Sequence, residues 1–159
     1  MRFLLVLSVV AGLGFALMPS SGSACLRAPQ PSLPTAPLSI ETLRGTYEFT
    51  VELATTDEQK ACGLMRRPRL GRAEGMLFRN RPAGPSYFWM KNTPQPLDML
   101  FIGPKGAVVH IAEHTTPYST NAYGTDRKVA AVLEVKAGTA SRLAIELGDP
   151  VRHSWFERD

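Results

Sequence analysis

The residues best suited to chemistry lie close together, between positions 87 and 102. They are Trp89, Lys91, Asn92 and Asp98. An aromatic plate beside a lysine–aspartate pair and an amide is suited to binding a small polar ligand, such as a sugar or a small acid. The same side chains also suit a structural role, in which Asp98 accepts hydrogen bonds from turn N–H groups and holds Lys91. The residue types alone leave both interpretations open.

Two apolar runs, at 87–90 and 97–102, must position this group of residues. Pro94 and Pro96 interrupt the chain between the runs, which predicts a strand, a turn and a second strand. In the second run both alternating rows of side chains are apolar, and a strand of that kind is covered on both faces. Asp98 lies in one of these rows. Because a lone buried carboxylate is costly, Asp98 must be paired or hydrogen-bonded.

Direct pairing of the two runs would place Trp89 opposite Asp98, with Lys91 diagonally across from the carboxylate. We therefore expect Asp98 to lie at the edge of a pocket that contains Trp89. Its expected hydrogen-bond or ion-pair partner is Lys91, Asn92 or Arg67.

Alternation along the rest of the chain predicts a mainly β, α+β fold. The other expected strands are 46–54, 107–112, 129–135 and 151–156. Thr55 or Thr56 should begin a short helix, because each has a Glu or Gln three residues later that completes a capping box. A second short helix is expected at 139–143. We expect a small, curled, mainly antiparallel sheet or a partly open barrel of about six or seven strands with two short helices.

The 159 residues are enough for one domain with a hydrophobic core. Residues 1–24 have a positive start, an apolar stretch and a small-residue end, the pattern of a secretory signal peptide. The apolar stretch, 3–18, is shorter than the ~20 residues that span a membrane. Residues 25–39 hold four prolines and predict an extended linker. A single β-rich domain is expected at 40–159, in a protein exported to the periplasm.

The two cysteines, Cys25 and Cys62, bear on how the protein is held in the cell envelope. Cys25 directly follows the small residues of the signal peptide, so a lipid at Cys25 would make a membrane-anchored lipoprotein. Gly22 stands where lipoproteins usually have leucine, which favours a soluble periplasmic form. A Cys25–Cys62 disulfide would tie an extended tail to a helix and is the less favoured alternative. For Cys62, a structural role is favoured over a nucleophilic one.

The formal charge of +4 falls to +3 when residues 1–24 are removed. Six arginines concentrate positive charge in one region. They are Arg66, Arg67, Arg69, Arg72, Arg79 and Arg81. A solvated basic face would explain them, and the functional alternative is an anionic partner such as a phosphate, a carboxylate or an envelope polymer. Export argues against nucleic acid as the partner, and membrane contact is expected only if Cys25 carries a lipid.

One pattern resembles a zinc site. His110, Glu113 and His114 read H-x-x-E-H, an inverted zinc-protease motif that requires a helix. The segment has the composition of a strand, in which four steps span about 13 Å. That distance is too long for two ligands of one metal, so we expect no zinc site.

The methionines suggest copper as a second metal. Met65, Met76, Met90 and Met99 have thioethers that would suit Cu(I). Methionine is also a good core residue, and three of these four lie inside apolar runs. We therefore expect core positions, with neither a metal nor a cofactor.

Six segments carry a resemblance to a known family. They are Gly63-Leu64-Met65 with Arg67, Gly75-Met76-Leu77-Phe78, Phe88-Trp89-Met90-Lys91-Asn92-Thr93, Pro96-Leu97-Asp98-Met99-Leu100-Phe101-Ile102, Glu134 to Gly138, and Gly148-Asp149. In this order and spacing they resemble the bacterial and archaeal family named domain of unknown function 192, over about 46–151. The resemblance implies that family's fold and a protein that is exported. The family has no established activity, so the resemblance transfers no mechanism. Its motif positions fall on Arg67, Trp89, Met90, Lys91, Asn92, Thr93 and Asp98.

These observations favour a binding or accessory module of the cell envelope, with a site for a small polar or anionic ligand. The expected ligand-binding residues are Arg67, Trp89, Lys91, Asn92 and Asp98, and no catalytic residue is assigned. One alternative is a hydrolytic enzyme that uses Asp98 as its base. Another is a structural protein-interaction domain. An enzyme site usually combines two titratable groups in a pocket, and the central stretch offers one carboxylate. Binding therefore ranks first, and catalysis stays open.

Overall fold

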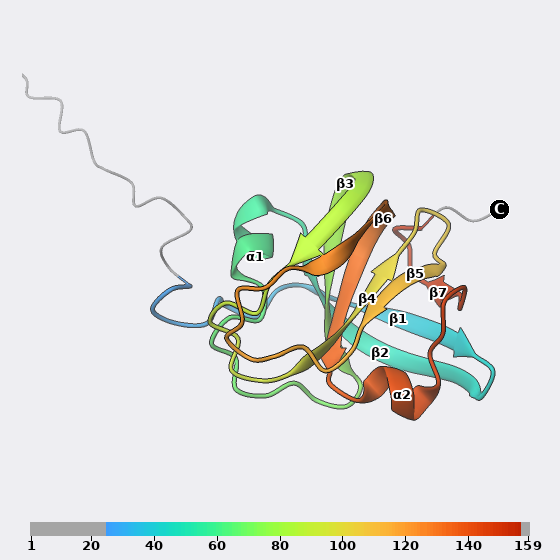
Figure 1. Cartoon of the computed structure of the whole chain (residues 1–159), viewed down its shortest axis with the longest axis horizontal. Coiled ribbons are helices and arrows are strands. Elements are labelled where there is room, and N and C mark those ends of the chain that lie inside the picture. Colours follow the sequence, from blue (N-terminus) through green and yellow to red (C-terminus); the bar gives the residue numbers. More distant parts are fainter. Residues whose placement is uncertain (1–24, 157–159) are drawn as a thin grey trace, which may run out of the picture.

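The computed structural model describes residues 25–156, which form a curled sheet of seven strands with two short helices (Figure 1). The strands are β1 (Thr35–Thr42), β2 (Gly45–Ala54), β3 (Glu74–Phe88), β4 (Leu97–Ile102), β5 (Val108–Ala112), β6 (Tyr123–Lys136) and β7 (Val151–Arg152). The helices are α1 (Asp57–Cys62) and α2 (Thr139–Leu143). Across the sheet the strand order is β5-β4-β6-β3-β2-β1-β7. The predicted signal peptide, 1–24, lies outside the described residues.

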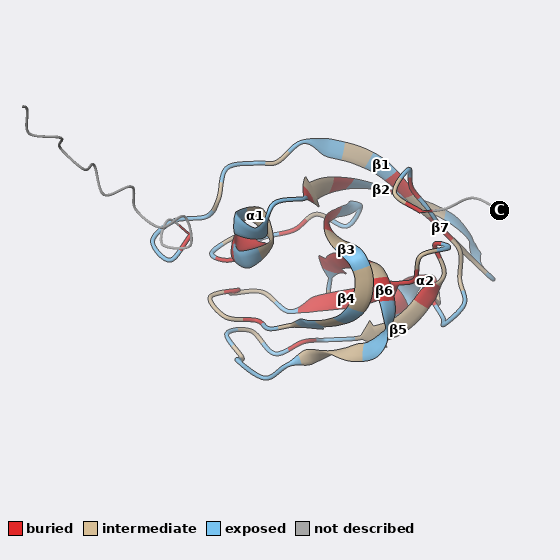
Figure 2. Cartoon of the chain, turned by 90° about the horizontal axis from the view of Figure 1, so that it is seen from above, coloured by how far each residue is buried: buried red, intermediate tan, exposed pale blue. Residues whose placement is uncertain are grey.

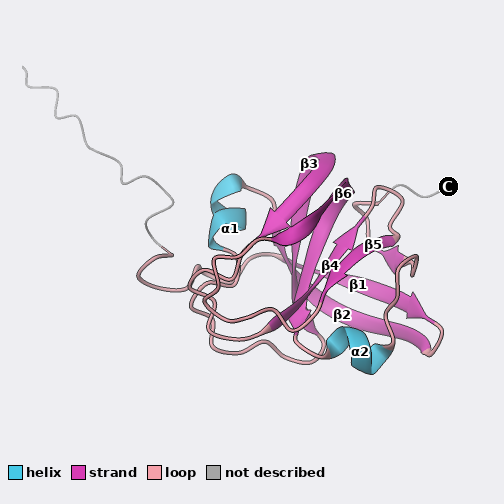
Figure 3. Cartoon of the chain, in the orientation of Figure 1, coloured by secondary structure: helices cyan, strands magenta, loops and turns pink. Residues whose placement is uncertain are grey.

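The sheet curls into a half-barrel (Figure 3). At one edge, β5 is joined to the turn just before β7 at the other edge: the Val108 N–H donates to the Asp149 carbonyl at 3.0 Å, and the Gly148 N–H donates to the Val108 carbonyl at 2.8 Å. The predicted β-rich, partly open barrel with two short helices is therefore confirmed. β2 and β3 are parallel, and the other neighbouring strands pair in antiparallel fashion. The parallel pair needs the long crossover that α1 and the following loop provide.

β4 lies between two hydrophobic clusters, and all six of its residues are buried (Figure 2). Leu100 and Ile102 belong to a cluster with residues of β1, β2 and α2. Leu97, Met99 and Phe101 belong to a second cluster with residues of β3 and the loop before it. The prediction that this strand is covered on both faces is confirmed.

β6 separates the two runs that were predicted to pair directly. β4 pairs with β6, and β6 pairs in turn with β3, which ends at Phe88. The predicted placement of Trp89 opposite Asp98 is therefore wrong. β6 takes the central position because it is also apolar on both faces, with Leu133 in one cluster and Val132 in the other.

Both short helices form where the sequence predicts them. Thr56 caps α1: its hydroxyl accepts the Gln59 N–H at 3.2 Å, and the Gln59 side chain accepts the Thr56 N–H at 3.0 Å. This is the predicted capping box. Among the described residues, no helix has the length and apolar character needed to cross a membrane.

β1 begins at Thr35, inside the predicted proline-rich linker, so the domain boundary expected near Ile40 falls too late. The strand pairs with β2 along its whole length, with Pro37 opposite Thr50. β7 covers β1 only at Ser39 and Ile40. Pro37 therefore lies where β1 is an edge strand, and there a missing N–H is tolerated.

A buried acid in β6 lies between two methionines. Glu134 is 4% exposed, and its cross-strand neighbours are Met76 of β3 and Met99 of β4. Burial disfavours the ionised carboxylate and raises the pKa of Glu134 from 4.5 to about 8. Between these two values the folded protein keeps a proton that the unfolded chain has lost. Stability contributed by the protonated side chain is therefore lost as the pH rises towards 8.

We predict that Glu134→Gln flattens the pH dependence of stability above pH 6.5. The wild-type free energy of unfolding should fall by up to about 1.4 kcal/mol per pH unit between pH 6.5 and about 8, whereas glutamine does not ionise. The comparison is limited to pH values above 6.5 because burial lowers the pKa of His153 below that value. At lower pH this histidine makes the free energy of unfolding rise with pH, which opposes the effect of Glu134. Urea unfolding at three pH values measures the slopes. The exposed change Glu146→Gln is the control, and equal slopes in wild type and Glu134→Gln would contradict the prediction.

Candidate functional site

Trp89 and Lys91 form the exposed part of the predicted site. Trp89 directly follows β3 and is 48% exposed. The Lys91 Nζ lies 5.0 Å from the centroid of the Trp89 ring, which is a cation–π distance. Both side chains line a small, open pocket of about 110 Å³ between residues 60–65 and 87–93. This hollow is called the Trp89 pocket below.

Two further side chains of the Trp89 pocket were not predicted. Lys60 of α1 lines it, with its Nζ 2.8 Å from the Asp57 carboxylate. Tyr87 lines it as well, and its hydroxyl donates to the Asp126 carboxylate at 2.6 Å. That hydrogen bond raises the pKa of Tyr87. The pocket therefore brings together two lysines and two exposed aromatic rings, one of which also offers a hydroxyl group.

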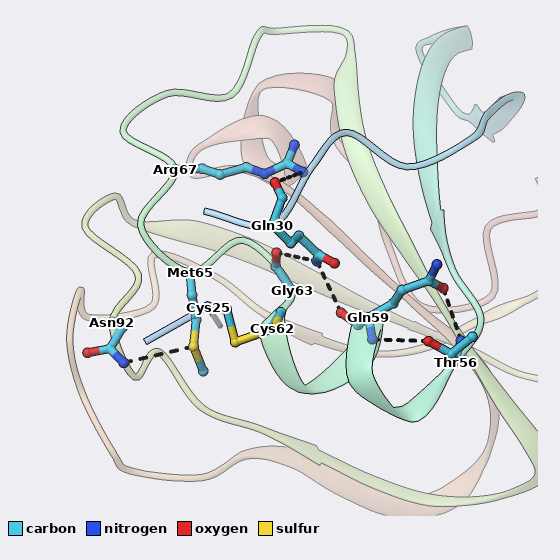
Figure 4. The surroundings of a disulfide bond; sticks show 9 residues. All are labelled: Cys25, Gln30, Thr56, Gln59, Cys62, Gly63, Met65, Arg67 and Asn92. Carbon is cyan, nitrogen blue, oxygen red and sulfur yellow. Dashed lines mark hydrogen bonds between the residues drawn. A yellow bond between two sulfur atoms is a disulfide. The ribbon is translucent and has the colours of Figure 1, made fainter. Parts of the chain in front are cut away.

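Cys25 and Cys62 form a disulfide (Figure 4). Cys62 also lines the Trp89 pocket, so the bridge lies beside it. The two Cα atoms are 5.5 Å apart. The sequence analysis had treated this bridge as the less favoured alternative, and the structure corrects that expectation. A sulfur atom in a disulfide is not a free thiolate, so Cys62 has the structural role expected of it.

The segment after Cys25 is bound to the domain, which explains why the bridge can form. The Gln30 side-chain amide donates to the Gln59 carbonyl at 3.1 Å and to the Gly63 carbonyl at 2.8 Å (Figure 4). The Gln59 carbonyl also accepts the Gly63 N–H at 2.9 Å, whereas the Gly63 carbonyl lies just beyond the last turn of α1. Gln30 therefore binds the C-terminal end of α1, and this segment is docked against the helix rather than extended as a free linker.

Arg67 fastens the same segment and does not line the Trp89 pocket. Its guanidinium forms an ion pair with Glu52 of β2, with 3.0 Å between Nη2 and Oε2. The Glu52 carboxylate also accepts the Leu33 N–H at 2.7 Å. Nη2 of Arg67 lies 3.4 Å from the Gln30 carbonyl oxygen. The charge of Arg67 is thus used to hold the N-terminal segment.

Asn92 shapes the loop that carries Lys91. Its φ of +57° is in the left-handed region, which asparagine tolerates better than most residues. Its carbonyl accepts the Arg66 N–H at 2.7 Å. Its side-chain amide points towards the Met65 sulfur, 3.9 Å away (Figure 4). These contacts give Asn92 a role in holding the loop.

Asp98 is fully buried, and its carboxylate accepts two backbone N–H groups. Oδ1 accepts the N–H of His114, and Oδ2 accepts the N–H of Ala140, each at 2.9 Å. Ala140 lies in the first turn of α2, whose N-cap residue, Gly138, has no side chain to cap it. Asp98 therefore caps α2 from a distant strand, and the positive end of the helix suits the carboxylate.

The predicted partners of Asp98, namely Lys91, Asn92 and Arg67, are wrong, and Asp98 does not line the Trp89 pocket. The reason is that β6 lies between β3 and β4, so side chains that follow β3 are not neighbours of β4. The sequence did contain one sign of the true partners, which is the glycine at the start of α2, Gly138. A helix that begins with glycine has no side chain to cap its first N–H groups, so these groups need an acceptor from elsewhere. Of the five predicted site residues, Trp89 and Lys91 come together in a pocket.

We predict that Asp98→Asn lowers the free energy of unfolding by about 2–3 kcal/mol. The amide can accept one of the two N–H groups, but its NH₂ group faces the other donor. Urea unfolding compares this variant with Glu146→Gln, a change of an exposed acid that should alter stability by less than about 0.5 kcal/mol. A stability of Asp98→Asn equal to that of the control would contradict the capping role.

Comparison with known proteins places this geometry in a family. Residues 39–153 match the DUF192 family, described as an uncharacterized ACR. The crystal structure of a protein of unknown function from Novosphingobium aromaticivorans is 34% identical, with a TM-score of 0.74, over 86% of this chain and 99% of that one. A Sinorhizobium meliloti structure, whose description proposes a transcription regulator, is 39% identical, with a TM-score of 0.74, over 77% of this chain and 96% of that one. No curated protein matches. The chain belongs to the DUF192 family.

Proposed function

We propose that the protein is an exported binding module of the cell envelope and that the Trp89 pocket holds its ligand. The observation that carries this proposal is the position of Lys91 over the exposed ring of Trp89, at the rim of an open pocket. Single exposed apolar side chains are normal, whereas exposed rings gathered at one place mark interaction sites, and Tyr87 and Trp89 line the same pocket. Ligand sites typically combine such apolar surfaces with a few well-placed polar groups.

The charges at the Trp89 pocket favour an anionic ligand. Lys60 is paired with Asp57, whereas Lys91 forms no ion pair with any residue in 25–156. A carboxylate or phosphate of the ligand would supply that partner. The flat face of Trp89 would pack against the body of the ligand. A sugar acid or a small organic acid has both features.

Two observations support export. Residues 1–24, which lie outside the described part of the structure, have the pattern of a signal peptide. The Cys25–Cys62 disulfide is a bond that persists in oxidising compartments such as the periplasm. The sulfur of Cys25 cannot carry a thioether-linked lipid while it is bonded to Cys62. The disulfide therefore favours a soluble periplasmic protein over a lipoprotein.

The geometry supports the alternatives less well. A hydrolase that uses Asp98 as its base would need that carboxylate to reach a substrate, but Asp98 is fully buried and accepts two backbone N–H groups. A protein-interaction domain would use the same exposed aromatic residues, Tyr87 and Trp89, together with Tyr118. Binding of small acids to the Trp89 pocket separates that alternative from our proposal.

The state of the cysteines tests export. We expect protein isolated from the cell envelope to begin near Cys25 and to resist alkylation by iodoacetamide until a reductant is added. Mass spectrometry of the intact chain, with and without reduction, measures both properties. Retention of residues 1–18 would contradict the signal peptide. A lipid mass on Cys25 together with an alkylated Cys62 would show a lipoprotein instead of the soluble form.

Fluorescence of Trp89 tests the ligand site. The chain has two tryptophans, so Trp155→Phe leaves Trp89 as the reporter. In that background we expect glucuronate or citrate to change the emission in a saturable way. Lys91→Met should weaken the binding at least about tenfold through the loss of a charged hydrogen bond, worth about 1.5–3 kcal/mol. Neutral glucose should bind more weakly than glucuronate.

The matched control is Lys128→Met, because Lys128 is an exposed lysine outside the Trp89 pocket. It removes the same charge from the protein without touching the pocket. Equal affinities in the two lysine variants would show that net charge rather than Lys91 attracts the acid. The absence of a saturable change with any of the acids would remove the support for an anionic ligand at Trp89.

A further inference from the structure

We propose that Asp98, Glu113 and His114 form a binding site for one divalent transition-metal ion, with Zn²⁺ the best-suited candidate. One carboxylate oxygen from each acid and one imidazole nitrogen all lie within 4.8 Å of one another. The three residues come from β4 and from the turn directly after β5. This site is separate from the Trp89 pocket, which none of them lines.

The spacing of the three ligand atoms suits a metal ion. Atoms that bind zinc at about 2.0–2.2 Å lie roughly 3–4 Å apart. Glu113 and His114 are exposed at the surface, so small rotations of their side chains would close the cluster around an ion. Three protein ligands would leave further positions for water or another group. Imidazole combined with carboxylates favours zinc and its neighbours over magnesium or calcium.

Asp98 gives the site a fixed side. Its carboxylate is held by the N–H groups of His114 and Ala140, each at 2.9 Å, and each oxygen keeps a second lone pair. One of these bonds comes from His114 itself, so the same carboxylate that would bind the ion also positions the backbone that carries the histidine. The carboxylate of Asp98 and the backbone of His114 are therefore arranged in advance.

His114 has a backbone conformation that few histidines adopt. Its φ is +49°, in the left-handed region. This turn brings His114 and Glu113 round to Asp98 at the end of β5. The His114 ring lies beside the start of α2, because a Cβ atom built on Gly138 would be in ordinary contact with the His114 Nε2, at 3.7 Å.

The charges of the cluster point in the same direction. The ligand oxygens of Asp98 and Glu113 come within 4.8 Å of each other, and two negative charges at that distance repel unless a positive charge lies between them. A divalent cation would remove that repulsion, with the neutral imidazole as the third ligand. The proposal departs from our expectation of no metal, which considered the two histidines of the H-x-x-E-H pattern as a pair. His110 instead packs against the Phe101 ring, with centroids 5.2 Å apart.

Zinc binding to the purified, untagged and disulfide-bonded protein tests the proposal. After treatment with EDTA and removal of the chelator, we expect calorimetry to show one Zn²⁺ per chain. We also expect the melting temperature to rise with zinc concentration. The variants His114→Asn and Glu113→Gln should each weaken zinc binding at least about tenfold and reduce the rise in melting temperature. Asparagine is chosen because it tolerates the left-handed backbone.

His110→Gln is the control, and it should bind zinc as the wild type does. His114→Asn and Glu113→Gln change exposed side chains, so the melting temperatures of these two variants without metal should stay close to that of the wild type. Zinc binding that is unchanged in His114→Asn, or that is lost in His110→Gln instead, would overturn the proposal. So would the absence of stoichiometric zinc binding in the wild type, or stronger binding of Ca²⁺ than of Zn²⁺.

Discussion

The fold depends on one buried carboxylate, that of Asp98, the second residue of its most buried strand, β4. The side chain joins β4, the turn after β5 and the start of α2 through two charge-assisted hydrogen bonds. An ionised group between two apolar clusters would be costly without such partners. The two N–H groups offset that cost, and they also decide where α2 begins and how the turn at His114 is shaped. An apolar residue at position 98 would fill the space but leave α2 without a cap.

A second region of the domain, around the N-terminal segment, is held by different chemistry. Here the covalent Cys25–Cys62 bond, the amide of Gln30 and the Arg67–Glu52 ion pair attach the N-terminal segment to α1 and β2. These contacts support the part of α1 that lines the Trp89 pocket. Asp98 and the N-terminal attachments therefore stabilise two separate regions, and each region carries one of the proposed sites. Because they share no residues, the two proposals stand or fall separately.

Local pattern was enough to predict most elements, whereas long-range pairing was not. The strand at 46–54 and both helices follow from alternation and from a capping box, which depend on neighbouring residues only. Asp98 was recognised as unusual for the right reason, but its partners were misassigned because β6 is more than twenty residues further along the chain. The disulfide was underrated because prolines suggested a free tail. The sequence offered no sign that Gln30 and Arg67 would anchor it.

The central position of β6 has a consequence for the order of folding. Gly75 of β3 pairs with Val135 of β6, sixty positions later. One edge of β4 also pairs with β6, so neither strand has all its partners until β6 has been made. Until residues 123–136 have been synthesised, β3 and β4 each have an unpaired edge, so the sheet cannot close while the chain is still emerging from the ribosome. Topologies with such distant contacts fold slowly. A chain that cannot complete its sheet until β6 has been made stays unfolded for longer, and this would suit the export that we propose.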